Sequence, residues 1–316
     1  MFVVIGSTTA DLLVLSQEPL ANPGGEGFQA SNLVFTGTPL SFSMGANGGN
    51  SAYVLAGLGV PTALCSAVGQ DALGKTLADW LETRGVNLDG LTRSDTRATS
   101  TSVILMSDAD NQVVFHHRGA NTGVRLEHMS DSLIAEADVL LATSFPLLPE
   151  MRAGGFAQAL TRAHESGAIT ALDIGPAIGD PVTMDEIIPL LRVTSYFIAN
   201  SHEITELAGC DDWEAAATQL LAAGATNVVI KRGAAGASLR RNDGDVDVPG
   251  FQVDAGASVG AGDAFNAGFL YGVQQEFTPE QAVRFGNAVA ALVVSGERGI
   301  MDSPSLAEVE RLLAAG

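Results

Sequence analysis

Short apolar runs typical of buried β-strands alternate along this chain with segments that have the spacing of amphipathic helices. Parallel strands buried on both faces read as near-continuous apolar runs, and a helix connects each strand to the next. The alternation therefore predicts an α/β fold built on a doubly wound, mostly parallel sheet. The expected strands are residues 2–6, 62–68, 139–143, 169–174, 196–199 and 227–231, and the expected helices are 51–58, 73–84, 150–166, 184–192 and 212–223.

Two stretches, residues 12–43 and 99–118, break this rhythm. Both are rich in Thr, Val, Phe and Ser, carry turn signals and lack a helical period. In the second stretch, two β-type runs flank Ser107-Asp108-Ala109-Asp110-Asn111, which is typical of a hairpin turn. We expect both stretches to form a small β appendage at one edge of a single α/β unit that spans residues 1–316.

The charge balance excludes several classes of partner. Lys and Arg total 16 against 36 Asp and Glu, a formal net charge of −20, and Lys75 and Lys231 are the only lysines. Nucleic acids and anionic membranes are bound by basic patches, so the sequence predicts neither as a partner. A bound anion must be held mainly by backbone N–H groups, a metal or a few arginines.

The start of the chain and the number of cysteines indicate the cellular compartment expected for the protein. The first residues, MFVVIGST, carry no basic segment and predict a first strand rather than a signal peptide, so we expect a cytoplasmic protein. Cys65 and Cys210 lie far apart in the sequence, and we expect two buried thiols rather than a disulfide framework.

Residues 69–76 (GQDALGKT) match the phosphate-binding P-loop pattern GxxxxGK[ST] letter for letter, between an expected strand and an expected helix. Asp71, however, is a favourable helix N-cap. Capping there starts the helix early and turns Lys75 onto its flank. A P-loop NTPase is one open interpretation, and a strand–turn–helix joint with an exposed lysine is the other.

Two further motifs are incomplete as catalytic sites. Residues 256–260 (GASVG) match the nucleophile elbow GxSxG, but no histidine follows Ser258, as the order of an α/β-hydrolase requires. Residues 202–206 (HEITE) resemble the zinc motif HExxH but end in Glu206, which removes the second imidazole. Neither motif therefore predicts its enzyme class.

Residues 260–263 (GAGD) open an apolar helical segment and predict an anion-binding turn. Two glycines let the backbone turn sharply at a helix start, where N–H groups point outward and the helix dipole favours negative charge. Asp263 lies in the same turn, where it can accept a proton from an incoming hydroxyl. An anion hole beside a base suits phosphoryl transfer to an alcohol, and a structural helix cap is the alternative.

Two other features suit the binding of a polyol. Residues 45–50 (GANGGN) form a glycine-rich stretch with two Asn side chains just before an expected helix. Asp11 lies just beyond the first strand, where a carboxylate accepts hydrogen bonds from vicinal hydroxyls. Each also has a structural interpretation, because Asn and Gly build turns and Asp11 can cap a helix or face water.

Taken together, these motifs resemble the PfkB (ribokinase) family of carbohydrate kinases over nearly the whole chain. Residues 45–52, with 55–59 and 68–74, resemble the N-terminal signature of the family, and residues 259–270 (VGAGDAFNAGFL) resemble its more specific C-terminal signature. Residues 200–203 (NSHE) fit the NxxE motif, and residues 228–237 (VVIKRGAAGA) fit the nucleotide-binding strand and loop. The resemblance implies a ribokinase-like fold in which the β appendage is a lid over the sugar.

The resemblance also implies a mechanism, ATP-dependent phosphorylation of a sugar hydroxyl with Mg²⁺. Asp263 would be the general base, the N–H groups of Gly260, Ala261 and Gly262 would stabilise the γ-phosphoryl group, and Lys75 and Ser258 would have no catalytic role. Glu203 would hold Mg²⁺, largely through water. The implied sugar ligands are Asp11, Asn47, Gly48, Asn50 and Asn121, and the implied ATP ligands are Asn200, Lys231, Gly233, Gly236 and Asn287.

Departures from the family pattern bear on cofactor and substrate. Ala257 stands where many relatives have an Asp that helps to bind a monovalent cation, which leaves the need for that cation open. Asn47 stands where Lys is common. With so few lysines, this favours a neutral sugar such as ribose or fructose over a phosphosugar, unless arginines serve. The arginines that could serve are Arg93, Arg97, Arg118 and Arg125.

A nucleoside is the alternative substrate within the family, and a lid aromatic such as Phe28, Phe35 or Phe42 would then stack on the base. A ligand-binding protein without catalytic activity remains as a different class. Lids of this family often form dimer contacts, and the sequence offers an apolar set for a homodimer. That set is Leu33, Val34, Phe35, Leu40 and Phe42.

Overall fold

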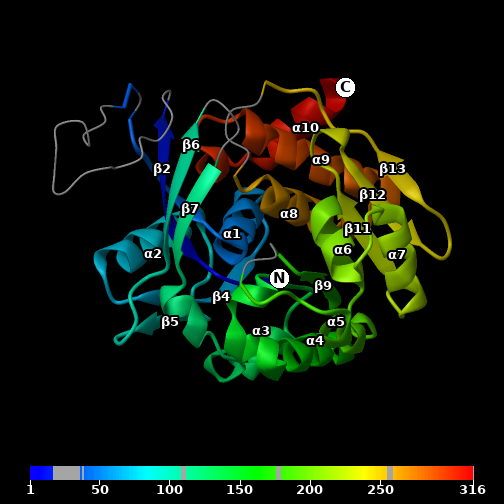
Figure 1. Cartoon of the computed structure of the whole chain (residues 1–316), viewed down its shortest axis with the longest axis horizontal. Helices are drawn as coiled ribbons and strands as arrows, with labels where there is room; N and C mark the ends of the chain where they lie inside the picture. The colour runs from blue at the N-terminus through cyan, green and yellow to red at the C-terminus, as the bar shows by residue number, and fades with distance from the viewer. Residues whose placement is uncertain (17–35, 38, 108–111, 176–178, 255–258, 316) are drawn as a thin grey trace.

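A nine-stranded sheet with helices on both faces forms the body of the protein (Figure 1). The computed structural model describes residues 1–16, 36–37, 39–107, 112–175, 179–254 and 259–315. The strands are β1 (Phe2–Ile5), β4 (Thr62–Gly69), β5 (Leu91–Ser94), β8 (Val139–Ala142), β9 (Ile169–Asp173), β10 (Tyr196–Asn200), β11 (Asn227–Lys231), β12 (Ala237–Arg241) and β13 (Val246–Val248). Their order is β13-β12-β11-β10-β9-β8-β1-β4-β5, and only the pairings of β12 are antiparallel among those described.

The six strands predicted from apolar runs are all present, and the doubly wound, mostly parallel sheet is confirmed. The pattern missed β5, β12 and β13. These strands are short and lie toward the two edges of the sheet, where partial exposure interrupts the apolar run.

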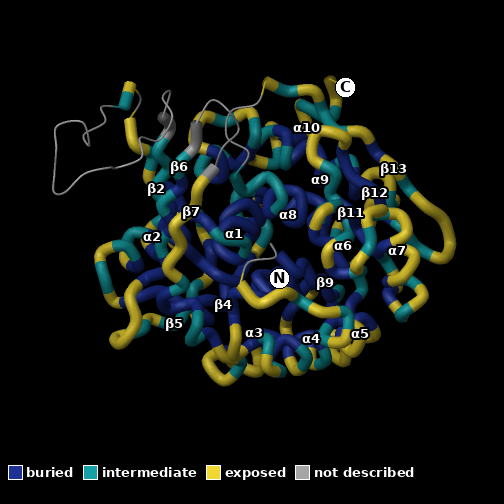
Figure 2. Tube along the Cα trace, viewed as in Figure 1, coloured by how far each residue is buried: buried dark blue, intermediate teal, exposed yellow. Residues whose placement is uncertain are grey.

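Alternate residues of β1 contribute to two hydrophobic cores, one on each face of the sheet. Phe2 and Val4 join one core, and Val3 and Ile5 join the other. Figure 2 shows the buried tube along the middle of the protein between more exposed helices. The first core packs α1 (Asn47–Gly57), α2 (Ala72–Arg84), α8 (Ala261–Gln274), α9 (Pro279–Ser295) and α10 (Leu306–Ala315). The second packs α3 (Asp131–Ala135), α4 (Phe156–Glu165), α5 (Met184–Leu191), α6 (Ser201–Ala208) and α7 (Trp213–Ala222).

A second, four-stranded sheet projects beside α1 and α2 (Figure 1). It consists of β2 (Thr9–Ser16), β3 (Ser41–Gly45), β6 (Thr101–Ser107) and β7 (Gln112–His117), in the order β3-β2-β6-β7. The two irregular stretches of the sequence thus combine, because β2 of the first pairs in parallel with β6 of the second. β2 starts earlier than predicted, at Thr9, and β3 extends to Gly45.

The first turn of α1 differs from the prediction. The sequence places a glycine-rich turn at residues 45–50 and a helix from residue 51, whereas α1 starts at Asn47. Its N-terminal turn lies directly on the chain that leaves β1, and the N–H of Gly49 donates to the carbonyl of Ser7 at 3.0 Å. A Cβ on Gly48 would lie 2.5 Å from the carbonyl carbon of Gly6, so this close approach requires glycine.

Other helices begin close to the predicted positions, except over residues 150–166. There, the irregular turn Met151–Gly155 precedes α4 because Gly154 has a φ of 143°.

The prediction that both cysteines are buried is confirmed for one of them. Cys65 is buried as predicted, and burial raises the pKa of its thiol to about 12. The predicted burial of Cys210 is wrong, because this residue follows the left-handed cap of α6 at the surface and is partly exposed. No helix in the described ranges is long and apolar enough to cross a membrane.

The P-loop match at residues 69–76 forms a joint between β4 and α2. The Asp71 carboxylate accepts the N–H of Gly74 at 2.8 Å and caps α2. It also accepts the N–H of Thr99 at 2.7 Å, which ties the joint to the chain entering β6. Lys75 lies on the flank of α2, paired with Asp79 at 2.5 Å, and its side chain is 74% exposed. The segment therefore does not wrap a phosphate.

We predict that Asp71→Ala lowers the free energy of unfolding by about 2 kcal/mol, because it removes an N-cap and the hydrogen bonds from Thr99. Urea unfolding at pH 7.5 measures the change. Lys75→Ala is the matched control on the same turn, with an expected loss below about 0.5 kcal/mol because its ion pair is exposed. Equal losses in the two variants would contradict the cap assignment.

Candidate active site

Asp263 lies where the first turns of α8 and α1 meet. α8 starts after Gly260, which has a φ of 86°, and Asp263 in the first turn is 6% exposed. Its carboxylate is held by two amides of α1. Nδ2 of Asn47 donates to Oδ1 at 2.8 Å, and Nδ2 of Asn50 donates to Oδ2 at 2.8 Å. The structure thus brings together three residues from the N-terminal and C-terminal signatures.

The surroundings shift the acidity of this carboxyl group. Burial raises the pKa of Asp263 to about 6, the hydrogen bond from Asn50 opposes the rise, and the charge of Asp173 adds to it. The group is therefore mainly ionised at neutral pH yet close to the range in which it can take up a proton. That balance is what general-base catalysis requires.

The start of α8 offers backbone donors next to this carboxylate. The N–H groups of a first helical turn have no partners within the helix, and the helix dipole adds positive potential. No side chain among the described residues caps α8. A Cβ on Gly262 would lie 3.5 Å from Nζ of Lys231, so the ammonium group lies close to this turn. Gly260, Ala261 and Gly262 therefore form an uncapped helix start with a lysine close by, and anion binding there stays a prediction.

Lys231 forms an ion pair with the buried carboxylate of Asp173. Its Nζ donates to Oδ2 of Asp173 at 2.6 Å and to Oδ1 of Asn266 at 3.3 Å, and Asn266 also donates to Asp173. Burial lowers the pKa of Lys231, but the carboxylates of Asp173 and Glu203 outweigh it, and the pKa is raised. The sequence reasoning missed Asp173 and Asn266 in this role. The available signals were that Asp173 ends an expected strand and that Asn266 lies one helical turn after Asp263.

Asp11 on β2 brings a second buried carboxyl group to the site. It is 5% exposed, and its Oδ1 has no partner among the described residues. Burial raises the pKa of Asp11 to about 6. A hydrogen bond from Ser102 lowers this pKa, and the charge of Asp263 raises it further. A Cβ on Gly45 of the neighbouring strand β3, which pairs with Thr9 of β2, would overlap the carboxylate. The glycine is therefore needed for Asp11 to lie where it does.

Two buried acceptor oxygens at the site lack a hydrogen-bond partner among the described residues. Oδ1 of Asn50, like Oδ1 of Asp11, is buried without a partner among the described residues. A buried acceptor without a donor costs free energy, and native proteins pair such groups or leave them for a ligand. Both oxygens are acceptors, so a molecule with several hydroxyl groups satisfies them. Gly48 supports this region through the close packing of α1 on the end of β1.

Asn121, an expected sugar ligand, hydrogen-bonds the backbone between β1 and β2. Its Oδ1 accepts the N–H of Thr8 at 3.1 Å, and its Nδ2 donates to the carbonyl of Thr8 at 3.0 Å. The side chain is 2% exposed. Its amide thus holds the connection between β1 and β2 with one oxygen lone pair and one N–H. The predicted role of Asn121 as a sugar ligand is not tested by these contacts and stays a prediction.

A cavity of about 320 Å³ lies beside the start of α8. Ala261 and Gly262 line one end, and most of the remaining wall is apolar, including Phe251 and Phe265. Asn287 donates to the carbonyls of Val248 and Pro249 at 3.2 Å each and so fixes that wall. Four of the expected ATP ligands line the cavity: Lys231, Gly233, Gly236 and Asn287.

Asn200 and Glu203 do not line that cavity. They form a capping box at the start of α6, in which Oδ1 of Asn200 accepts the N–H of Glu203 at 2.8 Å and Oε2 of Glu203 accepts the N–H of Asn200 at 2.7 Å. Burial raises the pKa of Glu203, partly offset by the charge of Lys231. Neighbouring His202 is an exposed partner of Glu206 at 3.4 Å. In the described ranges no cluster of three or more His, Cys, Asp or Glu side chains is arranged to hold a metal.

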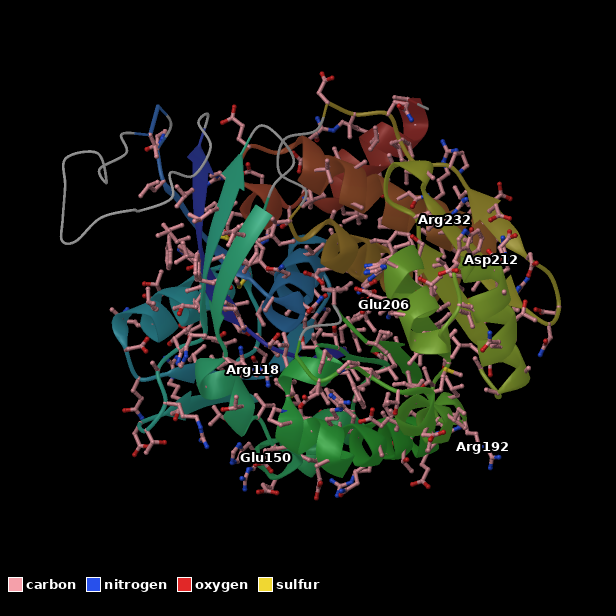
Figure 3. All side chains as sticks on the ribbon, in the orientation of Figure 1. Arg118, Glu150, Arg192, Glu206, Asp212 and Arg232 are labelled. Atoms are coloured by element: carbon pink, nitrogen blue, oxygen red, sulfur yellow. The ribbon has the colours of Figure 1, made fainter. Side chains whose placement is uncertain are left out.

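A larger cavity of about 570 Å³ lies elsewhere, beside α3 and α4. Its charged groups pair with each other, as in the 3.0 Å contact between Arg125 and Glu150. It contains none of the expected site residues. In Figure 3, Glu150 of this cavity lies at the bottom of the view, whereas Arg232, which follows Lys231 of the smaller cavity, lies at the upper right. The smaller cavity at α8 is therefore the one that adjoins the buried carboxylates.

The chain belongs to the PfkB family of carbohydrate kinases: it matches the family described as "pfkB family carbohydrate kinase" over residues 1–306. It is an ATP-dependent kinase that acts on a sugar or a nucleoside. Among curated relatives, it is 26% identical to the ribokinase of Haemophilus influenzae over 98% of this chain and 97% of that protein. It is 30% identical to the ATP-dependent ribose-1-phosphate kinase of Halopiger xanaduensis over 86% of this chain and 87% of that protein.

Solved structures share the fold. The ribokinase of Arabidopsis thaliana, complexed with ribose and ATP, superposes with a TM-score of 0.84 at 23% identity, over 99% of this chain and 98% of that one. A putative ribokinase II of E. coli, in complex with ATP and Mg²⁺, superposes with a TM-score of 0.81 at 20% identity, over 100% of this chain and 99% of that one. These likenesses confirm the ribokinase-like architecture with its smaller sheet.

We predict that Lys231→Met lowers the free energy of unfolding by about 3–5 kcal/mol, because it leaves the Asp173 carboxylate buried without a counter-charge. Urea unfolding at pH 7.5 measures the loss. The double variant Lys231→Met/Asp173→Asn removes both charges, and we expect it to recover at least half of the stability. A double variant no more stable than Lys231→Met would contradict the pairing.

Proposed function

We propose that the protein transfers the γ-phosphoryl group of ATP to a hydroxyl of a neutral sugar such as ribose or fructose. The observation that carries this proposal is the Asp263 carboxylate, buried between two amides and next to a helix start with free backbone donors. In the reaction, a sugar oxygen bonds to the γ-phosphorus, the bond from that phosphorus to the oxygen of ADP breaks, and Asp263 takes the hydroxyl proton.

The backbone of Gly260, Ala261 and Gly262 stabilises the transferred group. Their N–H groups are fixed before the reaction, so they cost no reorganisation when negative charge develops. Lys231 lies behind Gly262 and adds positive charge at short range. Because Asp173 already neutralises most of that charge, the backbone donors carry the larger part of the stabilisation.

The cavity of about 320 Å³ suits the adenine and ribose of ATP. Its apolar walls accept a flat base, and its end at Ala261 and Gly262 directs the phosphates toward Asp263. Gly233 and Gly236 also line it, and Asn287 in its wall is fixed by a hydrogen bond to the carbonyl of Val248. This geometry supports ATP as the phosphate donor on the side of α8 away from the lid.

Mg²⁺ fits the residues near α6. Mg²⁺ keeps several waters and takes one or two carboxylates together with phosphate oxygens, and Glu203 supplies one such carboxylate, with Asn200 beside it. When bound, the ion neutralises charge on the phosphates. For a monovalent cation, Ala257 lies outside the described residues and Asp254 is exposed, so the need for that cation stays a prediction.

The sugar lies between the lid and α1. Asp11 and Asn50 offer the unpaired acceptors described above, and Asn47 and Gly48 form the adjoining helix turn. A base-stacking role for Phe42 is not supported. Asp11 pairs with Ser43 on β3, and Phe42 is the residue next to Ser43 on that strand. Because successive side chains of a strand point to opposite faces, Phe42 faces away from Asp11, and its ring lies 5.6 Å from that of Trp80. Phe28 and Phe35 lie outside the described residues.

A phosphosugar is the second candidate, on one observation. A cavity of about 500 Å³ at the base of the lid is lined by Arg97, His116, His117 and Arg118. His116 contacts Ser102 at 3.1 Å, and Ser102 pairs with Asp11 in the same register of the lid. In a chain at −20, Arg97 and Arg118 concentrate positive charge near the substrate side, whereas burial lowers the pKa of His116 and favours its neutral form. The 30% identity to a ribose-1-phosphate kinase agrees with this candidate.

The test is ATP turnover over a panel of ribose, fructose, their phosphates and nucleosides. We expect the wild-type enzyme to prefer a neutral sugar, Asp263→Asn to lose at least about 10³-fold in kcat because the base is gone, and Lys75→Ala to keep its rate. Preference for a phosphosugar with loss of that preference in Arg118→Ala favours the second candidate.

Other outcomes overturn the proposal. Loss of activity in Lys75→Ala with retention in Asp263→Asn would move the chemistry to residues 69–76. Ligand binding in a thermal-shift panel without turnover of ATP would indicate a binding protein. Preference for nucleosides would favour the alternative substrate class.

We also propose a homodimer through the lid. The small sheet exposes large apolar side chains, and exposed apolar area of this kind marks interaction surfaces. Those side chains are Leu40, Phe42, Val113, Val114 and Phe115, exposed by 38–62%, while Leu33, Val34 and Phe35 lie outside the described residues. Light scattering is expected to give twice the 32.5 kDa of one chain, and a monomeric mass at micromolar concentration would contradict the proposal.

A further inference from the structure

A chain of hydrogen bonds leads from the end of β1 to the Asp263 carboxylate. The hydroxyl of Ser7 donates to Oγ of Ser144 at 2.7 Å. Oγ of Ser144 donates to Oδ1 of Asn47 at 3.3 Å, and Nδ2 of Asn47 donates to Oδ1 of Asp263 at 2.8 Å. Ser7 and Ser144 are fully buried. Neither serine is among the residues expected at the site from the sequence.

The protons of this chain have only one consistent arrangement. Oγ of Ser144 accepts two hydrogen bonds from Ser7, one from the hydroxyl and one from the backbone N–H at 3.1 Å. A hydroxyl oxygen has two lone pairs and one proton. Both lone pairs are therefore occupied, and the proton of Ser144 is left for Oδ1 of Asn47.

This arrangement decides which end of the Asn47 amide faces Asp263. An amide that is rotated by half a turn exchanges its oxygen and nitrogen. In the rotated state the nitrogen would meet Oγ of Ser144, whose lone pairs are taken, and the oxygen would meet the carboxylate of Asp263. Both contacts are unfavourable, so the Ser144 proton keeps the donor end of Asn47 on Asp263.

We propose that Ser144 is a positioning residue, which acts through Asn47 to keep a hydrogen-bond donor on the catalytic carboxylate. The inference rests on the proposed function, because it takes Asp263 as the general base. Asn50, the other amide on Asp263, has no such partner, since its Oδ1 is unpaired among the described residues. The chain from Ser144 therefore fixes one of the two donors independently of the substrate.

The backbone at Ser144 is consistent with this task. Its φ is 62°, in the left-handed region that a residue with a side chain adopts at a cost. Glycine takes this conformation without that cost. A serine here retains a hydroxyl group in a place where the backbone alone would favour glycine.

Other charged groups also face Asp263, and the test must hold them constant. Asp173 on β9 and Glu203 on α6 carry negative charge, Lys231 on β11 carries positive charge, and Asp11 faces it from the lid. None of these four hydrogen-bonds Ser144 among the described contacts. Substitution of Ser144 therefore changes the donor on Asp263 and leaves the surrounding charges in place.

The test is the pH dependence of kcat/KM between pH 5 and 9 for wild type, Ser144→Ala and Ser144→Gly. The wild-type rate is expected to fall with a midpoint near pH 6 as Asp263 takes up a proton. Both variants lose the hydroxyl, so their midpoints are expected to rise by about one pH unit, which lowers the rate at pH 6 about fivefold and leaves it nearly unchanged at pH 8.5. Ser144→Gly also removes the backbone strain and separates this effect from a loss of stability.

Two further variants make the result specific. In an Asn47→Ala background, Ser144→Ala is expected to cause no additional shift, because the connecting amide is gone. Ser66→Ala removes a buried serine hydroxyl with a similar bond, 2.8 Å to Oγ1 of Thr8, that does not lead to Asn47. Its midpoint is expected to equal that of wild type.

The outcomes separate the two proposals. Midpoints for Ser144→Ala and Ser144→Gly equal to that of wild type would overturn the inference, as would an equal shift in Ser66→Ala or an additive shift in the Asn47→Ala background. Retention of activity in Asp263→Asn would instead overturn the proposed function. A Ser144→Ala variant that fails to fold leaves the glycine variant to decide.

Discussion

The contact between the first turns of α1 and α8 is the interaction on which the site depends. It buries the Asp263 carboxylate and surrounds it with the amides of Asn47 and Asn50. Burial alone would favour the neutral acid and raise the pKa of Asp263. The hydrogen bonds from Asn47 and Asn50 stabilise the ionised form and lower that pKa in part. The result is a carboxylate that is charged at neutral pH and can still accept a proton.

Close backbone packing makes this contact possible. α1 reaches the site because Gly48 lets its first turn lie on the end of β1, and α8 begins at the left-handed Gly260. The same sheet edge carries Asp173 and Lys231 at the ends of β9 and β11. In a protein with a net charge of −20, the lysine nearest the site is occupied by Asp173. Backbone N–H groups are therefore left as the main donors for phosphate.

Much of the architecture could be predicted, because it follows from repeated local patterns. Central strands are apolar along their whole length, so all six expected ones are present, whereas the half-exposed β5 and β13 gave no such signal. The cap at Asp71 explains why a literal P-loop match is a joint between β4 and α2. The start of α1 could not be predicted, because it depends on a contact with Gly6 that is remote in the sequence.

The site was predictable to the extent that family motifs carry it. Asp263, Asn47 and Asn50 lie within the two signatures, and the structure brings them together. Asn121 lies outside these motifs, and its amide hydrogen-bonds the backbone of Thr8. Ser7 and Ser144 have no motif, since a serine matters here only through the geometry of its neighbours. Such roles depend on tertiary contacts that sequence patterns do not encode.

Direct titration of the Asp263 carboxylate is the most direct test of the account. In protein labelled with ¹³C at aspartate side chains, NMR follows each carboxyl signal with pH, and the signal lost in Asp263→Asn identifies the residue. The account predicts a midpoint near pH 6 for this signal. A midpoint at or below the ordinary value of 3.8 would contradict it, because burial would then not raise the pKa of Asp263.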